Sequence, residues 1–337
     1  MRGLGVREMM NPKVSVIIPN YNHARFLEAR ITSVLNQTYH DFEVIYLDDA
    51  STDNSNEVFS RFAGDNRIRA NFNNANSGSP FRQWNKGVEF ARGQYVWIAE
   101  SDDVADKTFL EELVPCLDAN PNVGLAFCKS WKIDDQGDIV ASWEEWTVDG
   151  KNDRWKKDFV EQGTEECYRQ LIVGITIPNA SSVLMRRDIY QKAGCADGTM
   201  KIAGDWLMWV KMLLLSDVAF VAKPLNYFRS HPYKVTKRTF VNGVLIQEDY
   251  KVIGHILKNL DVPSSVVDRV ADRMASRWIN GIISLDGWIP LRRNWAIYQQ
   301  AREIDRCLFR RFLGKALLRV PRAVWRRIQS NSRPTLR

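Results

Sequence analysis

Short apolar runs alternate with amphipathic segments over the first part of the chain. Runs rich in β-branched and aromatic residues predict strands, whereas apolar residues spaced three and four apart predict helices. The alternation is typical of a mostly parallel sheet with helices on its faces. The expected strands cover residues 14–18, 42–47, 67–72, 93–99 and 123–128, and the expected helices cover residues 24–36, 81–92 and 109–117, with another beginning near Thr52.

The second part of the chain is less regular. Residues 130–180 are rich in tryptophan and acidic residues, and residues 179–185 return to a strand-like pattern. Residues 205–215 predict a helix, and from about residue 240 the pattern is helical with breaks at Pro263 and Pro290. We therefore expect a sheet domain over residues 1–235, divided near residue 130, and a helical region over residues 236–337.

Polar clusters follow three of the expected strands: Asn20-Tyr21-Asn22, Asp48-Asp49 and Glu100-Ser101-Asp102-Asp103. In open α/β sheets, ligands bind beyond the carboxyl ends of the strands, so these clusters should converge on one crevice. Crowded carboxylates repel one another, and a bound Mg²⁺ or Mn²⁺ would remove that repulsion. The alternative for a single Asp-Asp pair is a cap on the following helix, with Asp48 the better candidate for that role.

Composition narrows the class of protein. The five cysteines are odd in number and far apart, which argues against a disulfide framework or a zinc site and favours a reducing compartment. The first residues lack the apolar core of a signal peptide, and no apolar run approaches the ~20 residues that cross a bilayer. We expect a cytoplasmic protein that is either soluble or peripheral on the inner face of the cell membrane.

The positive charge is concentrated at the carboxyl end. Residues 301–337 contain eleven Lys/Arg and two Asp/Glu, a net +9, which leaves the other 300 residues at −2. Within this tail, residues 306–328 combine an apolar helical stripe with a basic face, which suits an anionic membrane surface. Packing of the same helix on the domain is the alternative. No aromatic or base-reading module accompanies the charge, so we expect no nucleic-acid partner.

Two long stretches of the sequence resemble family 2 glycosyltransferases with the GT-A fold. They are VSVIIPNYNHARFLEARITSVLNQTYHDFEVIYLDDASTDNS and NSGSPFRQWNKGVEFARGQYVWIAESDD. The resemblance is close over residues 14–130 and weaker to about residue 235. It implies a Rossmann-like GT-A sheet with a carboxyl-terminal helical extension, and a nucleotide-diphosphate sugar as donor.

The resemblance also implies roles for individual residues. Pro19, Tyr21, Asn22 and Asp49 would line the nucleotide pocket, with Asp49 accepting a hydrogen bond from the base. Asp102 would hold the ribose or the metal, and Asp103 the metal, which we expect to be Mn²⁺ or Mg²⁺. His231 would match a late metal or phosphate ligand, although a lone surface histidine is common.

The catalytic base of the family is a carboxylate before a helix in the second half of the domain, and Asp205 matches it. A plain helix cap is the alternative for this residue. Three positions depart from the family pattern: Gly204 replaces the usual Glu, Glu100 replaces the usual first Asp, and Trp84 stands where an Arg is common, with Arg82 nearby.

Together these features predict an inverting, metal-dependent, hexosyltransferase-like enzyme that moves one sugar to a glycan or lipid-linked acceptor in surface polysaccharide biosynthesis at the cell envelope. Processive synthases of the family carry a Q-x-x-R-W motif, but here the nearest run is Met274-Ala-Ser-Arg277-Trp278. A catalytically silent module that only binds a sugar nucleotide is the second hypothesis. A nucleotidyltransferase comes last, because no Gly- and Lys/Arg-rich phosphate loop follows the first strand.

Overall fold

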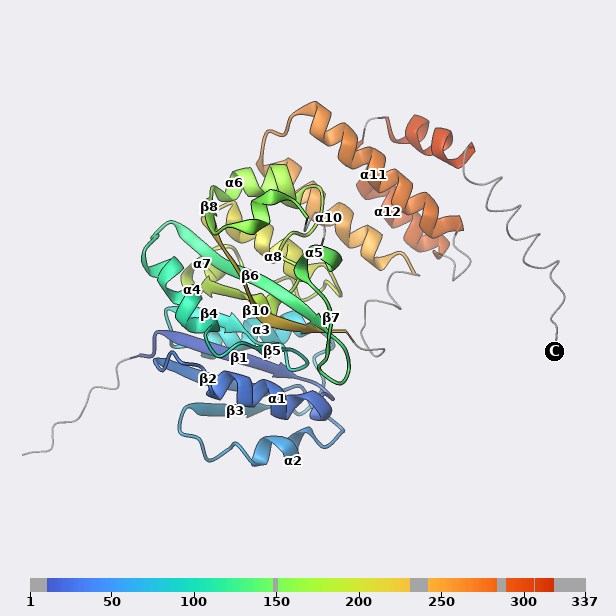
Figure 1. Ribbon diagram of the computed structural model, residues 1–337. Coiled ribbons are helices and arrows are strands. Elements are labelled where there is room, and N and C mark those ends of the chain that lie inside the picture. Colours follow the sequence, from blue (N-terminus) through green and yellow to red (C-terminus); the bar gives the residue numbers. More distant parts are fainter. Residues whose placement is uncertain (1–10, 148–150, 231–241, 284–288, 306, 318–337) are drawn as a thin grey trace, which may run out of the picture.

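The computed structural model describes residues 11–147, 151–230, 242–283, 289–305 and 307–317. Within these ranges one mixed sheet carries helices on both faces, and further helices follow it (Figure 1). The strands are β1 (Val14–Asn20), β2 (Phe42–Asp48), β3 (Ile68–Phe72), β4 (Tyr95–Ile98), β5 (Val104–Ala105), β6 (Val123–Ile133), β7 (Ile139–Ala141), β8 (Phe159–Glu161), β9 (Val183–Arg186) and β10 (Asp217–Arg229).

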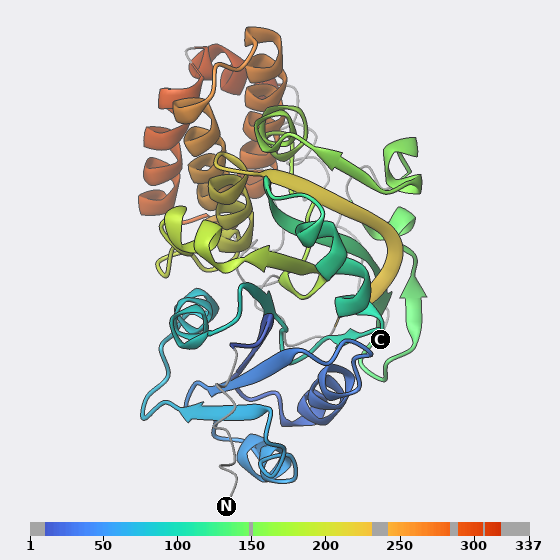
Figure 2. The ribbon, with the colours of Figure 1, turned by 90° about the vertical axis from the view of Figure 1, so that its left-hand side faces the viewer.

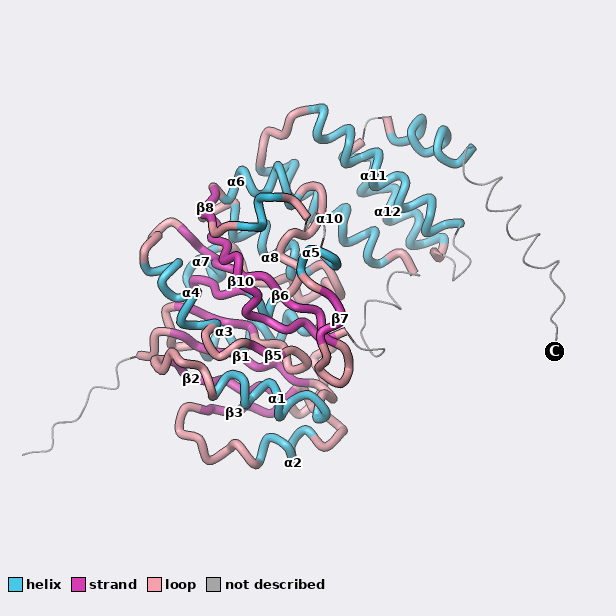
Figure 3. Tube along the Cα trace, in the orientation of Figure 1, coloured by secondary structure: helices cyan, strands magenta, loops and turns pink. Residues whose placement is uncertain are grey.

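The helices follow the same chain order. They are α1 (Ala24–Leu35), α2 (Ser55–Ser60), α3 (Pro80–Phe90), α4 (Phe109–Asp118), α5 (Trp143–Trp146), α6 (Gly163–Glu166), α7 (Arg187–Lys192), α8 (Gly204–Leu213), α10 (Val244–Asn259), α11 (Ser264–Ile283) and α12 (Leu291–Ile304), with short turns η1 (Asp153–Lys156), η2 (Cys167–Leu171) and η3 (Ala180–Ser182). Figure 3 shows strands at the centre of the sheet domain and helices alone in the region after it.

The sheet has the order β3-β2-β1-β4-β9-β6-β10-β5, with β7 beside β6 and β8 beside β10. Strand β1 pairs in parallel with β2 and β4, β2 with β3, and β6 with β10. Strand β9 runs antiparallel between β4 and β6 and so joins the two parallel blocks. The predicted GT-A fold class, a mostly parallel sheet flanked by helices with helices at the carboxyl end, is confirmed.

Two apolar layers hold the sheet. On one face, α1, α2 and α4 pack through residues such as Leu27, Phe59 and Phe109, and on the other face α3 and α8 pack through residues such as Trp84 and Trp209. Strand β1 is buried along its whole length, and a strand covered on both faces gives a continuous apolar run in the sequence. Because β1 pairs in parallel with β2 and β4, the carboxyl ends of the three strands lie at one edge, where the polar clusters begin.

The carboxyl-terminal helices stand at the end of the molecule opposite the first strands (Figure 2). They share an apolar cluster with the sheet domain, because Ile246 and Tyr250 of α10 and Met274 of α11 belong to the same buried set as Trp206 of α8. The boundary expected at residues 235 and 236 lies outside the described residues. The described helices therefore form part of the same packed body as the sheet.

Some elements differ from the expectation. The longest strand, β10, was not predicted, because Lys223, Pro224 and Asn226 interrupt its apolar pattern. The structure accommodates the interruption with register shifts against β6 around Pro224. The helix expected near Thr52 begins at Ser55, since Asp53 accepts hydrogen bonds from the backbone and side chain of Ser55 and so begins the helix later.

The described part of the basic tail packs on the domain, which was the alternative to membrane binding, and its expected contact with a membrane stays a prediction. Residues 308–317 form a helix in which Phe312 packs against Trp278 of α11, with ring centroids 5.0 Å apart. Arg311 pairs with Asp305 and Asp268, and Lys315 pairs with Asp272. Phe309, Leu313 and Leu317 remain exposed on the other side. Residues 318–337, which include the rest of the amphipathic helix predicted over residues 306–328, lie outside the described residues.

Candidate active site

The acidic cluster lies in the loop between β4 and β5. Asp102 and Asp103 are both buried, as is their neighbour Ser101, whose hydroxyl lies 2.8 Å from His23 Nδ1. The unpredicted strand β10 ends against this loop. The backbone N–H of Arg229 donates to Asp103 Oδ1 at 2.9 Å, and its Nε donates to the carbonyl of Asp102 at 2.8 Å. These bonds fix the loop and leave its carboxylates at the edge of the sheet.

Arg30 supplies positive charge beneath this loop. It is fully buried in α1, and its Nε donates to the carbonyl of Glu100 at 2.8 Å. Its two terminal nitrogens have no hydrogen-bond partner among the described residues. Burial lowers the pKa of Arg30 to about 10, although the charges of Asp103, Asp102 and Glu100 oppose the shift. The arginine therefore stays protonated at neutral pH and offsets part of the repulsion within the acidic cluster.

Glu100 differs from its two acidic neighbours, because an indole already occupies one of its oxygens. Trp84 Nε1 donates to Glu100 Oε1 at 2.7 Å. Burial, followed by the charge of Asp102, raises the pKa of Glu100 to about 8. At neutral pH this carboxyl is largely protonated, so the loop carries less negative charge than its sequence suggests. Arg82, the other basic candidate nearby, instead donates to the carbonyl of Ser77 and is exposed.

The two carboxylates at the end of β2 serve the loops around them. Asp48 Oδ2 accepts from the backbone N–H of Ser51 at 2.8 Å and so closes a turn; the expectation that Asp48 caps the following helix was wrong, because α2 begins only at Ser55, after Asn54. Asp49 is buried and accepts from the backbone and hydroxyl of Ser77 and from the side-chain amides of Asn73 and Gln83. Oδ1 takes three of these bonds and Oδ2 only one, so Oδ2 is the oxygen with capacity for a further donor.

The residues after β1 stand beside Asp48 and Asp49. Pro19 is buried in the strand, Tyr21 is 45% exposed, and Asn22 has a positive φ of 56°. The side-chain oxygen of Asn22 accepts from the backbone N–H of Thr52 at 2.7 Å. Ala50 also has a positive φ, of 60°. Left-handed backbone at non-glycine residues is costly and concentrates at functional sites, which draws attention to this pair of loops.

Asp205 lies in the first turn of α8. Its Oδ1 accepts from the backbone N–H of Trp206 at 2.7 Å. Burial raises the pKa of Asp205 to about 7, and the hydrogen bond to that N–H opposes the shift. A carboxyl with a pKa near 7 can take up and release a proton at neutral pH, which is what a general base requires.

Glu248 of α10 holds the segment that precedes Asp205. Its two carboxylate oxygens accept from three successive backbone N–H groups, those of Lys201, Ile202 and Ala203, at 2.7–2.9 Å. Glu248 is itself buried. A carboxylate with several N–H donors is a strong anchor, so a carboxyl-terminal helix fixes the backbone from which α8 starts.

Gly204, which replaces the usual acidic residue of the family, has a steric explanation. A Cβ built at this position would lie 2.4 Å from Cε2 and 2.5 Å from Cζ of Phe81. Phe81 in turn packs edge-on against Trp84, with centroids 5.0 Å apart. The ring of Phe81 fills the space that any side chain at residue 204 would need.

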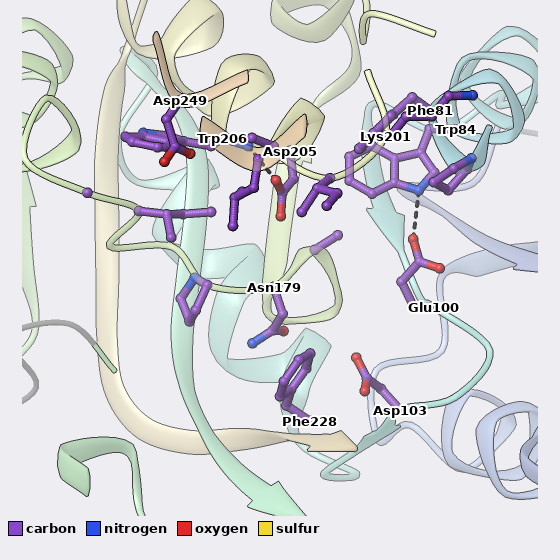
Figure 4. Close-up of a pocket in the computed structure, with 18 of the residues that line it drawn as sticks. Phe81, Trp84, Glu100, Asp103, Asn179, Lys201, Asp205, Trp206, Phe228 and Asp249 are labelled. Carbon is purple, nitrogen blue, oxygen red and sulfur yellow. Dashed lines mark hydrogen bonds between the residues drawn. The ribbon is translucent and has the colours of Figure 1, made fainter. Parts of the chain in front are cut away.

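One cavity of about 840 Å³ brings the two groups of acidic residues together. Glu100 and Asp103 line one part of it, and Asp205 lines another (Figure 4). Asp102 also lines this cavity. Pro19, Tyr21, Asn22 and Asp49 do not line this cavity; they lie at the adjoining strand ends. The cavity extends past Asp205 to α10 and α11, where Asp249, Arg273 and Arg277 line it.

The acidic side chains of the cavity suit a metal ion only together with oxygen atoms of a bound substrate. Among the residues that the structure describes, no three His, Cys, Asp or Glu side chains are arranged to hold a metal ion. Asp102 and Asp103 fit Mg²⁺ or Mn²⁺ in the usual manner, in which one or two carboxylates combine with the phosphates of a substrate. His231, the third predicted ligand, lies outside the described residues.

Several residues of the site were missed in the sequence. Arg30 had a signal, because it occupies a buried position in the apolar stripe of α1 between Leu27 and Val34. Glu248 and Arg229 had none, since their roles depend on tertiary contacts between elements far apart in the chain. Trp84 was noticed only as a departure from the family pattern.

Comparison with known proteins shows that the chain is similar to glycosyltransferases. The family model described as glycosyl transferase family 2 matches residues 15–194. Glycosyltransferase GlyG of Streptococcus pneumoniae is 37% identical over 105 residues, which are 31% of this chain and 35% of GlyG. TuaG of Bacillus subtilis, whose name refers to teichuronic acid biosynthesis, is 38% identical over 102 residues, 30% of this chain and 40% of TuaG. The matched region thus spans less than half the length of these relatives.

A solved structure resembles the fold over nearly the whole chain. Residues 1–349 of TarS from S. aureus, crystallised in complex with UDP-GlcNAc, superpose with a TM-score of 0.62 at 16% identity. The match covers 90% of this chain and 89% of that one. It therefore extends the likeness in fold beyond residue 194, into the carboxyl-terminal helices.

The contact between Gly204 and Phe81 gives a first prediction. Gly204→Ala should destabilise the protein by about 1–3 kcal/mol, because the added methyl group overpacks the site against the ring. Phe81→Ala in the same chain should remove the clash, so a double-mutant cycle measured by urea unfolding should show a favourable coupling of at least about 0.5 kcal/mol. Gly64→Ala is the control, because a Cβ there meets no atom within 4 Å. Additive effects of the two substitutions would contradict the steric explanation.

Proposed function

The chain belongs to glycosyl transferase family 2, and we propose that it is an inverting, metal-dependent glycosyltransferase that transfers one sugar from a nucleotide-diphosphate donor. The observation that carries the proposal is the position of Asp205. A carboxyl whose pKa is raised to about 7 lines the same cavity as the buried acidic pair Asp102 and Asp103. The proposed base and the proposed phosphate site thus line the same cavity. Transfer of a sugar to an acceptor hydroxyl requires this arrangement, because the acceptor and the donor must meet there.

The proposed reaction is a single displacement. Asp205 accepts the proton of an acceptor hydroxyl as that oxygen attacks the anomeric carbon of the donor sugar. The new C–O bond forms as the bond from the anomeric carbon to the diphosphate oxygen breaks. The electron pair of the broken bond leaves with the nucleoside diphosphate, and the configuration at the anomeric carbon inverts.

The residues of the acidic loop hold the other end of the donor. Asp102 and Asp103 would bind Mn²⁺ or Mg²⁺, which supplies Lewis-acid stabilisation of the departing diphosphate. Arg229 keeps the loop in place through its bonds to Asp102 and Asp103. Pro19, Tyr21, Asn22 and Asp49 form the proposed surface for the base and ribose, with the ring of Tyr21 exposed for stacking and Asp49 Oδ2 able to accept one more donor.

The donor and acceptor classes are inferred from the family. A nucleotide sugar is supported by the bound UDP-GlcNAc of TarS, and surface polysaccharide biosynthesis by the name of TuaG. We propose a glycan or lipid-linked acceptor and a hexosyl, non-processive transfer, since Met274 replaces the glutamine of the processive motif. An enzyme that acts on such acceptors would lie at the cytoplasmic face of the cell envelope.

A catalytically silent sugar-nucleotide-binding module is the second candidate. The packing of Phe81 over Gly204 favours it, because it leaves Asp205 without the acidic neighbour that is usual in the family. In this case the same cavity would bind the donor, but neither transfer nor hydrolysis would follow.

The exposed stripe near the carboxyl end supports a peripheral membrane contact. Phe309, Leu313 and Leu317 recur every four residues on the outer side of helix 308–317 and are 48–76% exposed. The sequence after them contains Arg319, Arg322 and Arg326. No helix among the described residues is long and apolar enough to span a membrane. We propose that this stripe inserts at an anionic lipid surface, with the basic residues at the headgroups.

Asp205→Asn tests the assignment of the base. The substitution should lower the transfer rate by about 10²–10⁴-fold, the usual contribution of a general base, and leave the affinity for UDP and Mn²⁺ unchanged. Transfer is read by mass spectrometry of the acceptor and nucleotide affinity by calorimetry. Undiminished turnover would remove Asp205 from this role. A wild-type protein that binds UDP but gives neither transfer nor donor hydrolysis would favour the silent module.

The raised pKa of Asp205 predicts the pH dependence. The transfer rate should rise tenfold per pH unit below about pH 7 and level off above it, because only the ionised carboxylate can take the proton. Stability should change in the opposite direction. The folded pKa exceeds the unfolded one, so ionisation opposes folding, and Asp205→Asn should stabilise the protein by up to about 4 kcal/mol above pH 7 and by nothing below about pH 4. A stabilisation that does not vary with pH would contradict the shift.

The membrane contact is tested by exchanging the exposed stripe. Phe309→Ser, Leu313→Ser and Leu317→Ser together should reduce co-sedimentation with phosphatidylglycerol vesicles at least about tenfold, because each buried apolar side chain contributes about 1.5–3 kcal/mol. The matched control is Ile139→Ser with Val140→Ser, an equally exposed apolar pair on β7. High salt should weaken the wild-type binding. Wild-type protein that stays in the supernatant would exclude the contact.

A further inference from the structure

One wall of the cavity is formed by a polar stripe on α11. Arg273, Ser276, Arg277 and Asn280 line the cavity, and their spacing of three and four residues places them on one face of the helix. The opposite face is apolar, with Met274, Ala275 and Trp278 buried against the other helices. A helix between an apolar core and solvent normally turns its polar face outward, and here that face borders the open cavity that also contains Asp205.

Among the residues that the structure describes, the ionised side chains of this wall do not balance. Asp249 of α10 is buried and pairs with Arg277 at 2.5 Å. Arg273 lies one turn earlier, and no ion pair or side-chain hydrogen bond of Arg273 is found among the described residues. Burial, followed by the like charge of Arg277, lowers the pKa of Arg273. One carboxylate thus faces two guanidinium groups. A second anion at this wall would offset both the desolvation of Arg273 and its repulsion by Arg277.

Gly174 leaves room for the guanidinium of Arg273. An ideal Cβ at residue 174 would lie 3.1 Å from Nη2 and 3.4 Å from Nη1, and Gly174 itself lines the cavity. The guanidinium therefore lies close over the backbone at this point, and the apolar residues Ile175, Pro178 and Trp206 also line the cavity. A planar guanidinium held in this way can offer paired N–H donors to a phosphate or carboxylate.

The position of this wall identifies which ligand would reach it. In Figure 4, Asp249 and Asp103 lie well apart, with Asp205 between them in the view. The acidic loop is the proposed place of the donor diphosphate, so the space on the other side of Asp205 is left for the acceptor. The acceptor hydroxyl must contact Asp205, and the rest of the acceptor then extends toward α11.

We propose that Arg273, supported by Arg277, binds an anionic group of the acceptor, so that the acceptor is a phosphate- or carboxylate-bearing saccharide and not a neutral one. The inference rests on the proposed function, because it takes Asp205 as the base and the acidic loop as the donor site. It deepens that function by naming the class of acceptor.

Binding of small saccharides tests the proposal without knowledge of the natural acceptor. The affinities of the wild-type protein for glucose 1-phosphate, glucuronic acid and glucose are measured by tryptophan fluorescence, with and without UDP and Mn²⁺. At least one anionic sugar should bind about tenfold more tightly than glucose, and the sugar that does so distinguishes phosphate from carboxylate recognition. Arg273→Gln should remove most of this preference, and Arg273→Lys only part of it. Arg269→Gln, an exposed arginine one turn away on α11, is the control and should change nothing.

The outcomes separate the two proposals. Equal affinity of the wild-type protein for the three sugars, or a preference that survives Arg273→Gln, would overturn the anionic acceptor even if UDP binds and the donor is hydrolysed. Weaker UDP binding by Arg273→Gln in the absence of sugar would also overturn it, because Arg273 would then contact the donor diphosphate. Failure of the wild-type protein to bind UDP would contradict the proposed function instead, and the sugar preference measured without UDP would still decide the inference.

Discussion

Burial of carboxyl groups around one cavity is the constraint on which the rest of this structure depends. Glu100, Asp102, Asp103, Asp205 and Asp249 all line that cavity, and desolvation is the largest cause of the raised pKa values of Glu100, Asp205 and Asp249. Different partners offset this desolvation at each carboxyl. Arg30 lies buried under the acidic loop, and the indole N–H of Trp84 donates to Glu100. Asp205 accepts from the backbone N–H of Trp206, and Asp249 pairs with Arg277. The pKa values of Glu100, Asp205 and Asp249 are thereby raised to different values around one cavity, as a proposed base beside a proposed cation site requires.

The three departures from the family pattern form one connected group. Trp84 donates to Glu100, so the longer acidic side chain and the indole that replaces a common arginine contact each other directly. Trp84 also packs against Phe81, and Phe81 fills the space beside Gly204. A substitution at one of these positions therefore alters the contacts of its neighbours in the group. The departures are therefore consistent with an altered but intact site, in which Asp205 follows a glycine in the first turn of α8.

Much of the fold could be predicted from the sequence, because the first strands and helices have strong local periodicity. Strand β10 could not, since its pattern is broken at Pro224 and its stability comes from pairing with β6 and β8. The acidic loop and Asp205 were recognised from motifs that are local in sequence. Glu248 and Arg229 were not recognised, because they bond to residues 45 and more than 120 positions away in the chain. Arg273 was not recognised, because the pattern of its helix does not show which face meets the cavity. Sequence patterns thus identified the groups that react, and only tertiary structure revealed the groups that position them.

The central claim is that Asp205 is a carboxyl poised to exchange a proton near neutral pH. It is measured most directly by ¹³C NMR of aspartate carboxyl carbons in the intact protein, with the signal of Asp205 assigned by its loss in Asp205→Asn. The account predicts a titration midpoint near pH 7, because burial in the cavity outweighs the hydrogen bond from Trp206. A midpoint at or below about pH 4, the ordinary range of an exposed aspartate, would contradict it.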